Sequence, residues 1–157
     1  MNIFVLDNSP YKAAEYHNNK HVVKMILETG QLLSTAHHVL DDGKELSPLL
    51  FKPSHINHKC AVWACESIMN YVWLWHLGQG LLQEYTKRYG RVHARTETLE
   101  YLQRCPLNIP RKRMTPFAQA MPDEYKNEDA VTAYRNYYMG AKRHLAQWNT
   151  KVPDWWV

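Results

Sequence analysis

The chain has 157 residues, of which 45% are hydrophobic, and its formal net charge is +4. The N-terminal stretch lacks the basic region and long apolar run of a secretory signal peptide, which argues against export, and the most apolar segment contains Glu66, Asn70, His76 and Gln79, which argues against a membrane span. Three unevenly spaced cysteines argue against a disulfide framework. We therefore expect one cytoplasmic domain over residues 1–157, with no membrane segment.

The first predicted elements are a short arm and a long helix. Residues 2–6 are apolar and short, and we expect them to pack as an extended arm beside the first helix. Residues 9–40 are predicted to form one helix, because Ser9 is a good N-cap and Pro10 suits the first helical position. The segment Asp41-Asp42-Gly43 is a turn signal that ends this helix.

A second and a third helix are expected in the middle of the chain. Residues 58–89 have apolar side chains pointing in most directions, which is typical of a helix at the centre of a core. Gly90 is placed to end that helix in the C′ position. The third helix is predicted over residues 92–105, where Pro106 stops it.

The last third of the chain holds a long loop and a final helix. Residues 106–126 contain four prolines and no periodicity, and a loop of this length is often functional. The last helix is predicted to begin after Asn127 as N-cap and to run to about Trp148. The expected fold is all-α, a single-domain bundle of four to five helices with a long proline-containing loop.

A line of polar residues runs along the predicted helix 9–40, at alternating spacings of four and three residues: His17, His21, Lys24, Glu28, Gln31, Thr35 and His38. Apolar residues flank this line on both sides, and one flank consists of Tyr16, Val23, Leu27 and Val39. The line therefore faces either a walled pocket or, as on an ordinary surface helix, open solvent.

Four members of this line are candidate catalytic residues: His17, His21, Lys24 and Glu28. In a walled pocket, desolvation makes the neutral amine of a lysine more accessible as a nucleophile. Glu28 lies four residues after Lys24, so the two also fit a plain helical ion pair, which is the favoured interpretation.

Metal binding is a weaker alternative, for which the possible ligands are His17, His21, His55 and His58. The H-E-x-x-H and E-x-x-H patterns of helical metal sites are missing from the sequence. Lys24 also lies one turn from His21, where its positive charge disfavours a divalent ion. We therefore expect no metal and no cofactor.

Basic and aromatic residues predict an anionic partner, DNA or a nucleotide. Residues 87–157 hold thirteen Lys and Arg against seven Asp and Glu. The candidate phosphate-binding and base-stacking residues are Arg91, His93, Arg135, Tyr137, Tyr138 and Lys142. A solvated basic surface and an ordinary core stripe are the structural alternatives for the same residues.

Three patches resemble the phage pyrimidine-dimer DNA glycosylases of the endonuclease V type, which are small all-α proteins. The patches are AAEYHNNKH around His17, the basic turn Lys87-Arg88-Tyr89-Gly90, and YRNYYMGAK in the last predicted helix. The resemblance implies cleavage of a base–sugar bond through an imine between an amine and the sugar, assisted by a carboxylate.

Two positions differ from the pattern that the resemblance implies. The family nucleophile is the α-amine of a small residue exposed after removal of methionine, whereas Asn2 normally leaves Met1 in place. The family's acidic residue lies seven positions after the helix histidine, where this chain has Lys24, and the nearest acid is Glu28. Lys24 is therefore expected to supply the amine if this chemistry is retained.

The sequence supports three functional hypotheses. The first is a phage-encoded, nucleic-acid-acting enzyme of DNA glycosylase type, with an amine or carboxylate in a pocket lined by His, Lys and Glu. The second is a nucleotide or metal-assisted hydrolase that uses His17, His21, His55 and His58. The third is a non-enzymatic protein that binds a nucleotide or a host factor.

Overall fold

The computed structural model describes residues 1–42 and 47–157, and Gly43 of the predicted turn lies outside them. In the described residues the fold is all-α, as predicted. Its elements are α1 (Pro10–Tyr16), α2 (Asn19–Leu40), α3 (Lys59–Glu66), α4 (Ile68–Tyr89), α5 (Thr96–Tyr101), the 3-10 helix η1 (Asp123–Tyr125), α6 (Ala130–Ala141) and the 3-10 helix η2 (Arg143–Leu145). These are six α-helices instead of four or five, because each of the two long predicted helices is divided.

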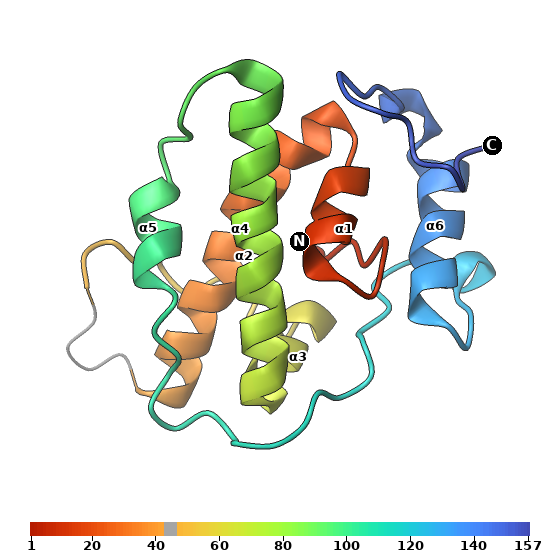
Figure 1. The fold of residues 1–157 in the computed structure, drawn as a ribbon. Coiled ribbons are helices and arrows are strands. Elements are labelled where there is room, and N and C mark those ends of the chain that lie inside the picture. The colour runs from red at the N-terminus through yellow and green to blue at the C-terminus, as the bar shows by residue number, and fades with distance from the viewer. Residues whose placement is uncertain (43–46) are drawn as a thin grey trace.

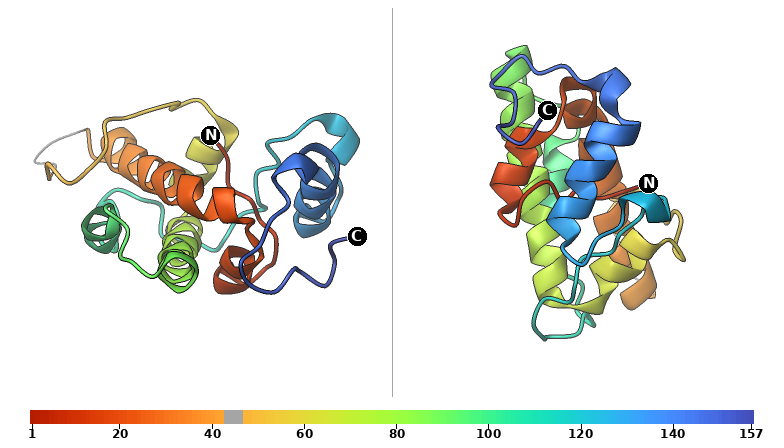
Figure 2. Two further views of the ribbon diagram at one scale, coloured as in Figure 1. Left: turned by 90° about the horizontal axis from the view of Figure 1, so that it is seen from above. Right: turned by 90° about the vertical axis from the view of Figure 1, so that its right-hand side faces the viewer.

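The helices are arranged around a pair of long ones. Helices α2 and α4 run side by side, α1 packs on α4, and α3 packs on α2 and α4 (Figure 1). The long loop after α5 passes along one end of this group to reach η1 and α6 (Figure 1). Helix α6 stands apart from α2 and α4, with parts of both terminal segments between them (Figure 2). Residues 3–6, next to the start of the chain, therefore lie inside the molecule, where several elements meet.

The N-terminal arm is part of the core. Residues 3–6 are all buried and lie outside the helices, as predicted, but they are not extended throughout, because the Leu6 N–H donates to the Phe4 carbonyl at 3.0 Å in a tight turn at Val5. The Phe4 ring stacks on the His21 ring of α2 at a centroid distance of 4.5 Å, and on the Tyr137 ring of α6 at 6.1 Å. The arm thus fills the space between α2 and α6, and burial of these side chains supplies much of the contact between the two.

The predicted helix 9–40 is interrupted at His17 and Asn18, so the prediction of one continuous helix is wrong. His17 has an extended conformation (φ −61°, ψ 136°), and Asn18 begins α2 as an N-cap. The Asn18 side chain accepts a hydrogen bond of 2.9 Å from the backbone N–H of His21. The backbone N–H of Asn18 donates to the Tyr138 hydroxyl. Asparagine competes for helical backbone groups in this way, and here the competition ends α1.

A buried arginine satisfies the backbone at this break. The Arg88 side chain has no solvent exposure and donates to the carbonyl of His17 at 2.7 Å. It also donates to the carbonyl of Glu15 at 2.9 Å and to the carboxylate of Glu84 at 2.9 Å. The carbonyls at the end of α1 thus find a cationic donor from α4 instead of the next helical turn.

The predicted helix 58–89 is interrupted at Ser67, which is extended (φ −158°, ψ 143°). The Ser67 hydroxyl accepts from the Met69 N–H at 3.0 Å and donates to the Lys112 carbonyl at 2.8 Å. The N–H of Ile68 donates to the carbonyl of Pro110. The long loop therefore takes up the backbone groups that a continuous helix would pair internally.

Among the predicted ends of the later helices, one is confirmed and the others are wrong. Gly90 ends α4 in the left-handed conformation (φ 68°, ψ 23°), as predicted. The third helix is confined to Thr96–Tyr101 instead of residues 92–105, and just beyond its end the Tyr71 hydroxyl donates to the Leu102 carbonyl at 2.7 Å. The last helix is capped by Asp129, not Asn127, and ends at Ala141, well before Trp148.

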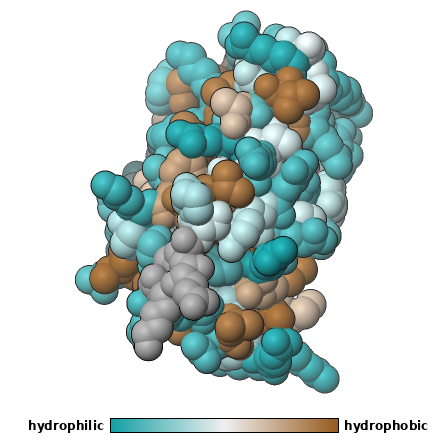
Figure 3. Space-filling model, turned by 90° about the vertical axis from the view of Figure 1, so that its left-hand side faces the viewer, coloured by the Kyte–Doolittle hydropathy of each residue, from teal (hydrophilic) through white to brown (hydrophobic). Residues whose placement is uncertain are grey.

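No helix among the described residues is long and apolar enough to cross a bilayer. On the side of the molecule drawn in Figure 3, hydrophobic side chains are scattered among hydrophilic ones.

Candidate functional site

A carboxylate on α2 faces the start of the chain. Glu28 Oε2 accepts a hydrogen bond of 3.0 Å from the Asn2 N–H, and its Oε1 lies 3.9 Å from the α-amine of Met1. The same Oε1 lies 3.5 Å from Lys24 Nζ, which confirms the predicted i,i+4 pair. The Glu28 side chain is only 12% exposed, whereas that of Lys24 is 66% exposed. Glu28 therefore holds two amines, one on a buried arm and one on the surface.

The α-amine of Met1 is held in place and reachable from solvent. The Met1 side chain is only 4% exposed, while the residue as a whole is half-buried. The accessible part of Met1 is therefore its main chain, which carries the amine. The amine thus lies at the surface, with a carboxylate 3.9 Å away.

Asn2 connects this amine to four parts of the fold. Its side-chain N–H donates to the Ala120 carbonyl at 2.9 Å, and its side-chain oxygen accepts from the Tyr134 hydroxyl at 3.2 Å. The same oxygen faces Cys60 Sγ at 3.6 Å. Together with its bond to Glu28, these contacts join the arm to α2, α3, α6 and the long loop. Sequence reasoning missed this role, because one polar residue before an apolar run does not reveal its partners.

His58 lies beside the amine and the carboxylate. It is the N-cap of α3, and its Nδ1 accepts a hydrogen bond of 3.0 Å from the Cys60 N–H, so Nε2 carries the proton when the ring is neutral. Burial lowers the pKa of His58, and the charge of the Met1 amine lowers it further. A neutral imidazole next to an amine can exchange protons with it or with a bound substrate.

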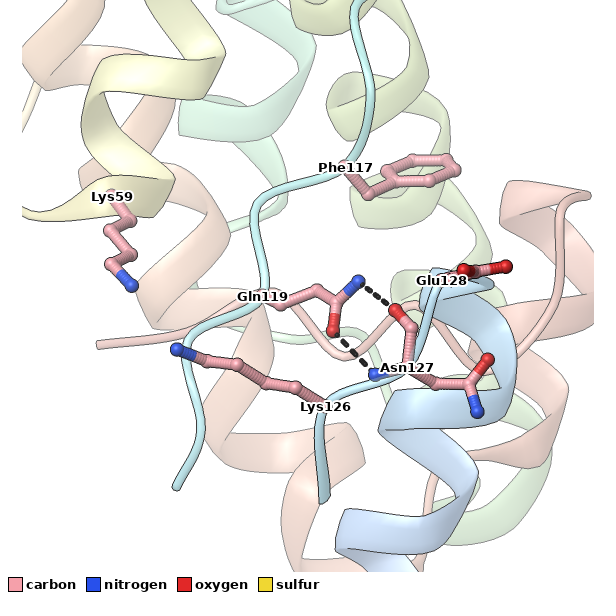
Figure 4. A pocket seen from close by; sticks show the side chains of 6 residues that line it. All are labelled: Lys59, Phe117, Gln119, Lys126, Asn127 and Glu128. Carbon is pink, nitrogen blue, oxygen red and sulfur yellow. Dashed lines mark hydrogen bonds between the residues drawn. The ribbon is translucent and has the colours of Figure 1, made fainter. Parts of the chain in front are cut away.

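An open depression of about 740 Å³ lies next to these residues, between α3, the long loop and the start of α6. It is lined by Lys59, Phe117, Gln119, Lys126, Asn127 and Glu128 (Figure 4). Lys59 precedes Cys60, and Gln119 precedes Ala120, and both of these neighbours contact Asn2. The depression and the amine of Met1 are therefore close together, because residues that line the depression are chain neighbours of residues that contact Asn2.

The two histidines predicted to be catalytic lie in the core. His17 Nδ1 lies 2.7 Å from the Ala13 carbonyl, and His21 Nδ1 lies 2.7 Å from the Tyr138 hydroxyl. Burial lowers the pKa of His17 to about 4 and, with the neighbouring His17 as a second cause, that of His21 to about 3. Both rings are therefore neutral at physiological pH, and the structure places them beneath Phe4 as packing residues.

The polar line does not face a pocket with two apolar walls. On the flank expected to form one wall, Val23 and Leu27 are each 37% exposed and Val39 is 46% exposed. These side chains lie on the surface of α2 and form no wall of a pocket. Of the four predicted catalytic residues, the structure thus brings only Lys24 and Glu28 together near an amine.

The predicted phosphate-binding residues fall into separate groups. Arg135 donates to the Leu6 carbonyl at 2.9 Å and to Asp7 at 3.2 Å, and Tyr138 is fully buried. Arg91 donates to the Tyr85 hydroxyl at 3.0 Å at the end of α4. The ring of His93 packs edge-on against the same tyrosine at a centroid distance of 4.8 Å.

Tyr137 and Lys142 lie near the arm, as do Arg135 and Tyr138. The Lys142 ammonium lies 5.0 Å from the Tyr137 ring centroid, and this ring stacks on Phe4. Tyr137 and Lys142 are half-buried, so each retains some exposed surface.

The histidines named as possible metal ligands do not gather. Among residues 1–42 and 47–157, no group of three or more His, Cys, Asp or Glu side chains is arranged to hold a metal ion. His17 and His21 are buried beneath the arm, whereas His58 lies at the start of α3. The structure therefore offers no geometry for the metal-assisted alternative in these residues.

Comparison of the chain with protein-family models, with curated proteins and with solved structures finds no match. A functional proposal for this protein therefore depends on the geometry around Glu28.

Proposed function

We propose that this protein is a nucleic-acid-acting enzyme of DNA glycosylase type, in which an amine beside Glu28 attacks the sugar. The observation that carries the proposal is the distance of 3.9 Å between Glu28 Oε1 and the α-amine of Met1. This amine replaces Lys24 as the favoured nucleophile. The resemblance to the pyrimidine-dimer glycosylases supports the same chemistry, because an α-amine and a carboxylate carry it there.

One property favours the α-amine over the side chain of Lys24. The Met1 side chain is 4% exposed and fixes the position of its amine, whereas Lys24 is 66% exposed and lies on a long, mobile side chain. A fixed nucleophile has less entropy to lose on the way to the transition state.

The proposed reaction begins with attack of the neutral Met1 amine on C1′ of the sugar. The bond between C1′ and the base breaks, and its electron pair leaves with the base, which takes the first amine proton. The second amine proton passes through the Glu28 carboxylate to the ring oxygen O4′. The sugar ring then opens, and an imine between C1′ and the amine nitrogen remains.

Exposed cations around the amine provide a surface for the strand. Lys24 on α2, Lys59 on α3 and Lys126 after η1 are all exposed, and Lys142 is half-buried beside Tyr137. Such charges attract the phosphates of a nucleic acid, and an aromatic ring beside them can stack on a base. The site therefore combines a nucleophile, a carboxylate and contacts for a polyanion.

Reductive trapping tests the proposal directly. The protein is mixed with DNA duplexes that carry either a cyclobutane pyrimidine dimer or an abasic site, and sodium borohydride is added to reduce any imine. We expect a covalent protein–DNA adduct whose linked peptide contains Met1. A protein with extra residues placed before Met1 is the control, and it should lose the adduct. An absence of adduct on both duplexes would refute the proposal.

A further inference from the structure

We propose that Lys59 and Lys126 form a phosphate subsite, which holds a phosphodiester of the nucleic-acid strand next to the reacting sugar. This inference rests on the proposed function, because it names how the substrate of the same site is bound. The juxtaposition that carries it is the approach of two ammonium groups, from separate elements, on one side of the depression (Figure 4).

The two ammonium groups lie on the same side of the depression. Lys59 comes from the first residue of α3, and Lys126 follows η1, so residues 67 positions apart in the chain meet here. Figure 4 shows both side chains directed toward the same space. The two like charges repel each other; Asp123 offsets part of this repulsion, and a further anion between the two ammonium groups would offset more of it. A phosphodiester offers two non-bridging oxygens, which share one negative charge, to two such donors.

The ammonium group of Lys126 is held by Asp123. Lys126 Nζ forms an ion pair of 2.8 Å with Asp123, and this hydrogen bond raises the pKa of Lys126. Asp123 itself is 94% exposed, so water largely screens its charge. The pair holds the ammonium group in place and keeps it charged, while its remaining N–H groups stay available to a ligand.

The wall of the depression is rigid. The Gln119 side chain donates to the Asn127 carbonyl at 2.7 Å and accepts from the Asn127 N–H at 3.2 Å, which ties the loop to the residue after Lys126. The Phe117 ring stacks on the Trp63 ring of α3 at a centroid distance of 5.4 Å. These contacts hold the backbone segments that carry the two lysines in place before any ligand binds, which favours binding.

The depression is directly connected to the proposed nucleophile. Asn2 contacts Cys60 Sγ and the Ala120 carbonyl, and its N–H donates to Glu28 at 3.0 Å. A strand with its sugar at the Met1 amine would therefore place a neighbouring phosphate on the lysine side of the depression. Glu128 lies on the opposite side (Figure 4), where its charge repels a phosphate and limits the strand to the lysine side.

The salt dependence of DNA binding tests this subsite. Fluorescence anisotropy with a labelled duplex that carries an abasic site gives the dissociation constant over a range of KCl concentrations. We expect Lys59→Ala and Lys126→Ala each to weaken binding several-fold and to reduce the slope of log K against log salt by about 1, as for the loss of one phosphate contact. The double variant should reduce the slope by about 2.

Lys151→Ala is the matched control. Lys151 forms an ion pair of 3.0 Å with Asp154, three residues away, as Lys126 does with Asp123, but it lies in the C-terminal segment. This variant should bind the duplex with the wild-type slope. Unchanged slopes in both lysine variants, or no binding of the duplex by the wild-type protein, would overturn the subsite.

The outcome can be separated from that of the proposed function. Glu28→Gln removes the carboxylate that assists the reaction and leaves both lysines, so it should lose trapping and bind the duplex at least as tightly as the wild type. Reduced slopes in the lysine variants without any trapped adduct would support the subsite and refute the glycosylase. Trapping with unchanged slopes would support the glycosylase and refute the subsite.

Discussion

The carboxylate of Glu28 and the main chain of Asn2 are joined by a hydrogen bond of 3.0 Å, which anchors the start of the chain to the middle of α2. Because of this bond, the other carboxylate oxygen faces the Met1 amine at 3.9 Å. A side chain 26 residues away thus determines where the first amine of the chain lies.

Glu28→Gln tests the role of the carboxylate in the proposed reaction. The amide of glutamine can still accept the Asn2 N–H bond, but it cannot take a proton from the amine. We expect the rate of borohydride trapping to fall by about 10² to 10⁴, the usual contribution of general acid–base catalysis. Lys24→Ala is the companion variant, and with saturating duplex its trapping rate should stay near that of the wild type. A loss of trapping in Lys24→Ala with retention in Glu28→Gln would return Lys24 to the role of nucleophile.

Asn2→Ala tests whether the side chain of Asn2 anchors the start of the chain to the rest of the fold. The change removes the bond to Ala120 and leaves the Tyr134 hydroxyl with one partner fewer. We expect a loss of about 1 to 3 kcal/mol in the free energy of unfolding, measured by urea denaturation, because buried polar groups lose their partners. Asn108→Ala, at an exposed position with one side-chain bond of 3.2 Å, is the control and should change stability by less. Equal losses in the two variants would contradict a special role for Asn2.

Arg88→Met tests the junction between α1 and α2. The substitution leaves the partly buried Glu84 carboxylate without its cation and the carbonyls of Glu15 and His17 without their donor. Removal of one partner of a buried pair typically costs about 3 to 5 kcal/mol, and we expect a loss of this size in urea or thermal denaturation. Lys87→Met changes the same kind of charge at the neighbouring exposed position and should have little effect. A small effect at Arg88 would mean that α1 ends for another reason.

The buried histidines predict how stability depends on pH. The pKa values of His17 (about 4) and His21 (about 3) in the folded chain lie below the value near 6.5 of an unfolded histidine. Between these values the unfolded chain binds more protons, so acid favours unfolding. The contribution of these two rings to the free energy of unfolding should be fully present above pH 6.5. It should fall as the pH decreases toward 4, with a slope that approaches about 1.4 kcal/mol per pH unit for each ring.

His21→Asn provides the check on this assignment. Asparagine cannot titrate, and its side chain can replace the hydrogen bond between His21 Nδ1 and the Tyr138 hydroxyl. The variant is expected to be less stable at pH 7 because the Phe4 ring loses its stacking partner. Its stability should nevertheless change less steeply between pH 6.5 and 4 than that of the wild type, as urea denaturation at several pH values would measure. The same slope in both proteins would exclude His21 as a source of the dependence.

Local sequence signals were sufficient for the fold class and for several element boundaries. The prediction of an all-α chain, the end of α4 at Gly90 and the apolar arm before α1 each depend on residues close together in sequence. The i,i+4 pair of Lys24 and Glu28 follows from helix geometry alone. Such features are predictable because the groups that interact are separated by no more than a turn.

The tertiary structure decided the breaks in the long helices and the composition of the site. Arg88 satisfies the carbonyl of His17 from 71 residues away, and the Ser67 hydroxyl donates to the Lys112 carbonyl from 45 residues away. No local pattern shows that a backbone group will find such a partner. For the same physical reason the polar line on α2 was visible in the sequence, while the amine facing Glu28 became evident only when the buried arm placed Met1 beside it.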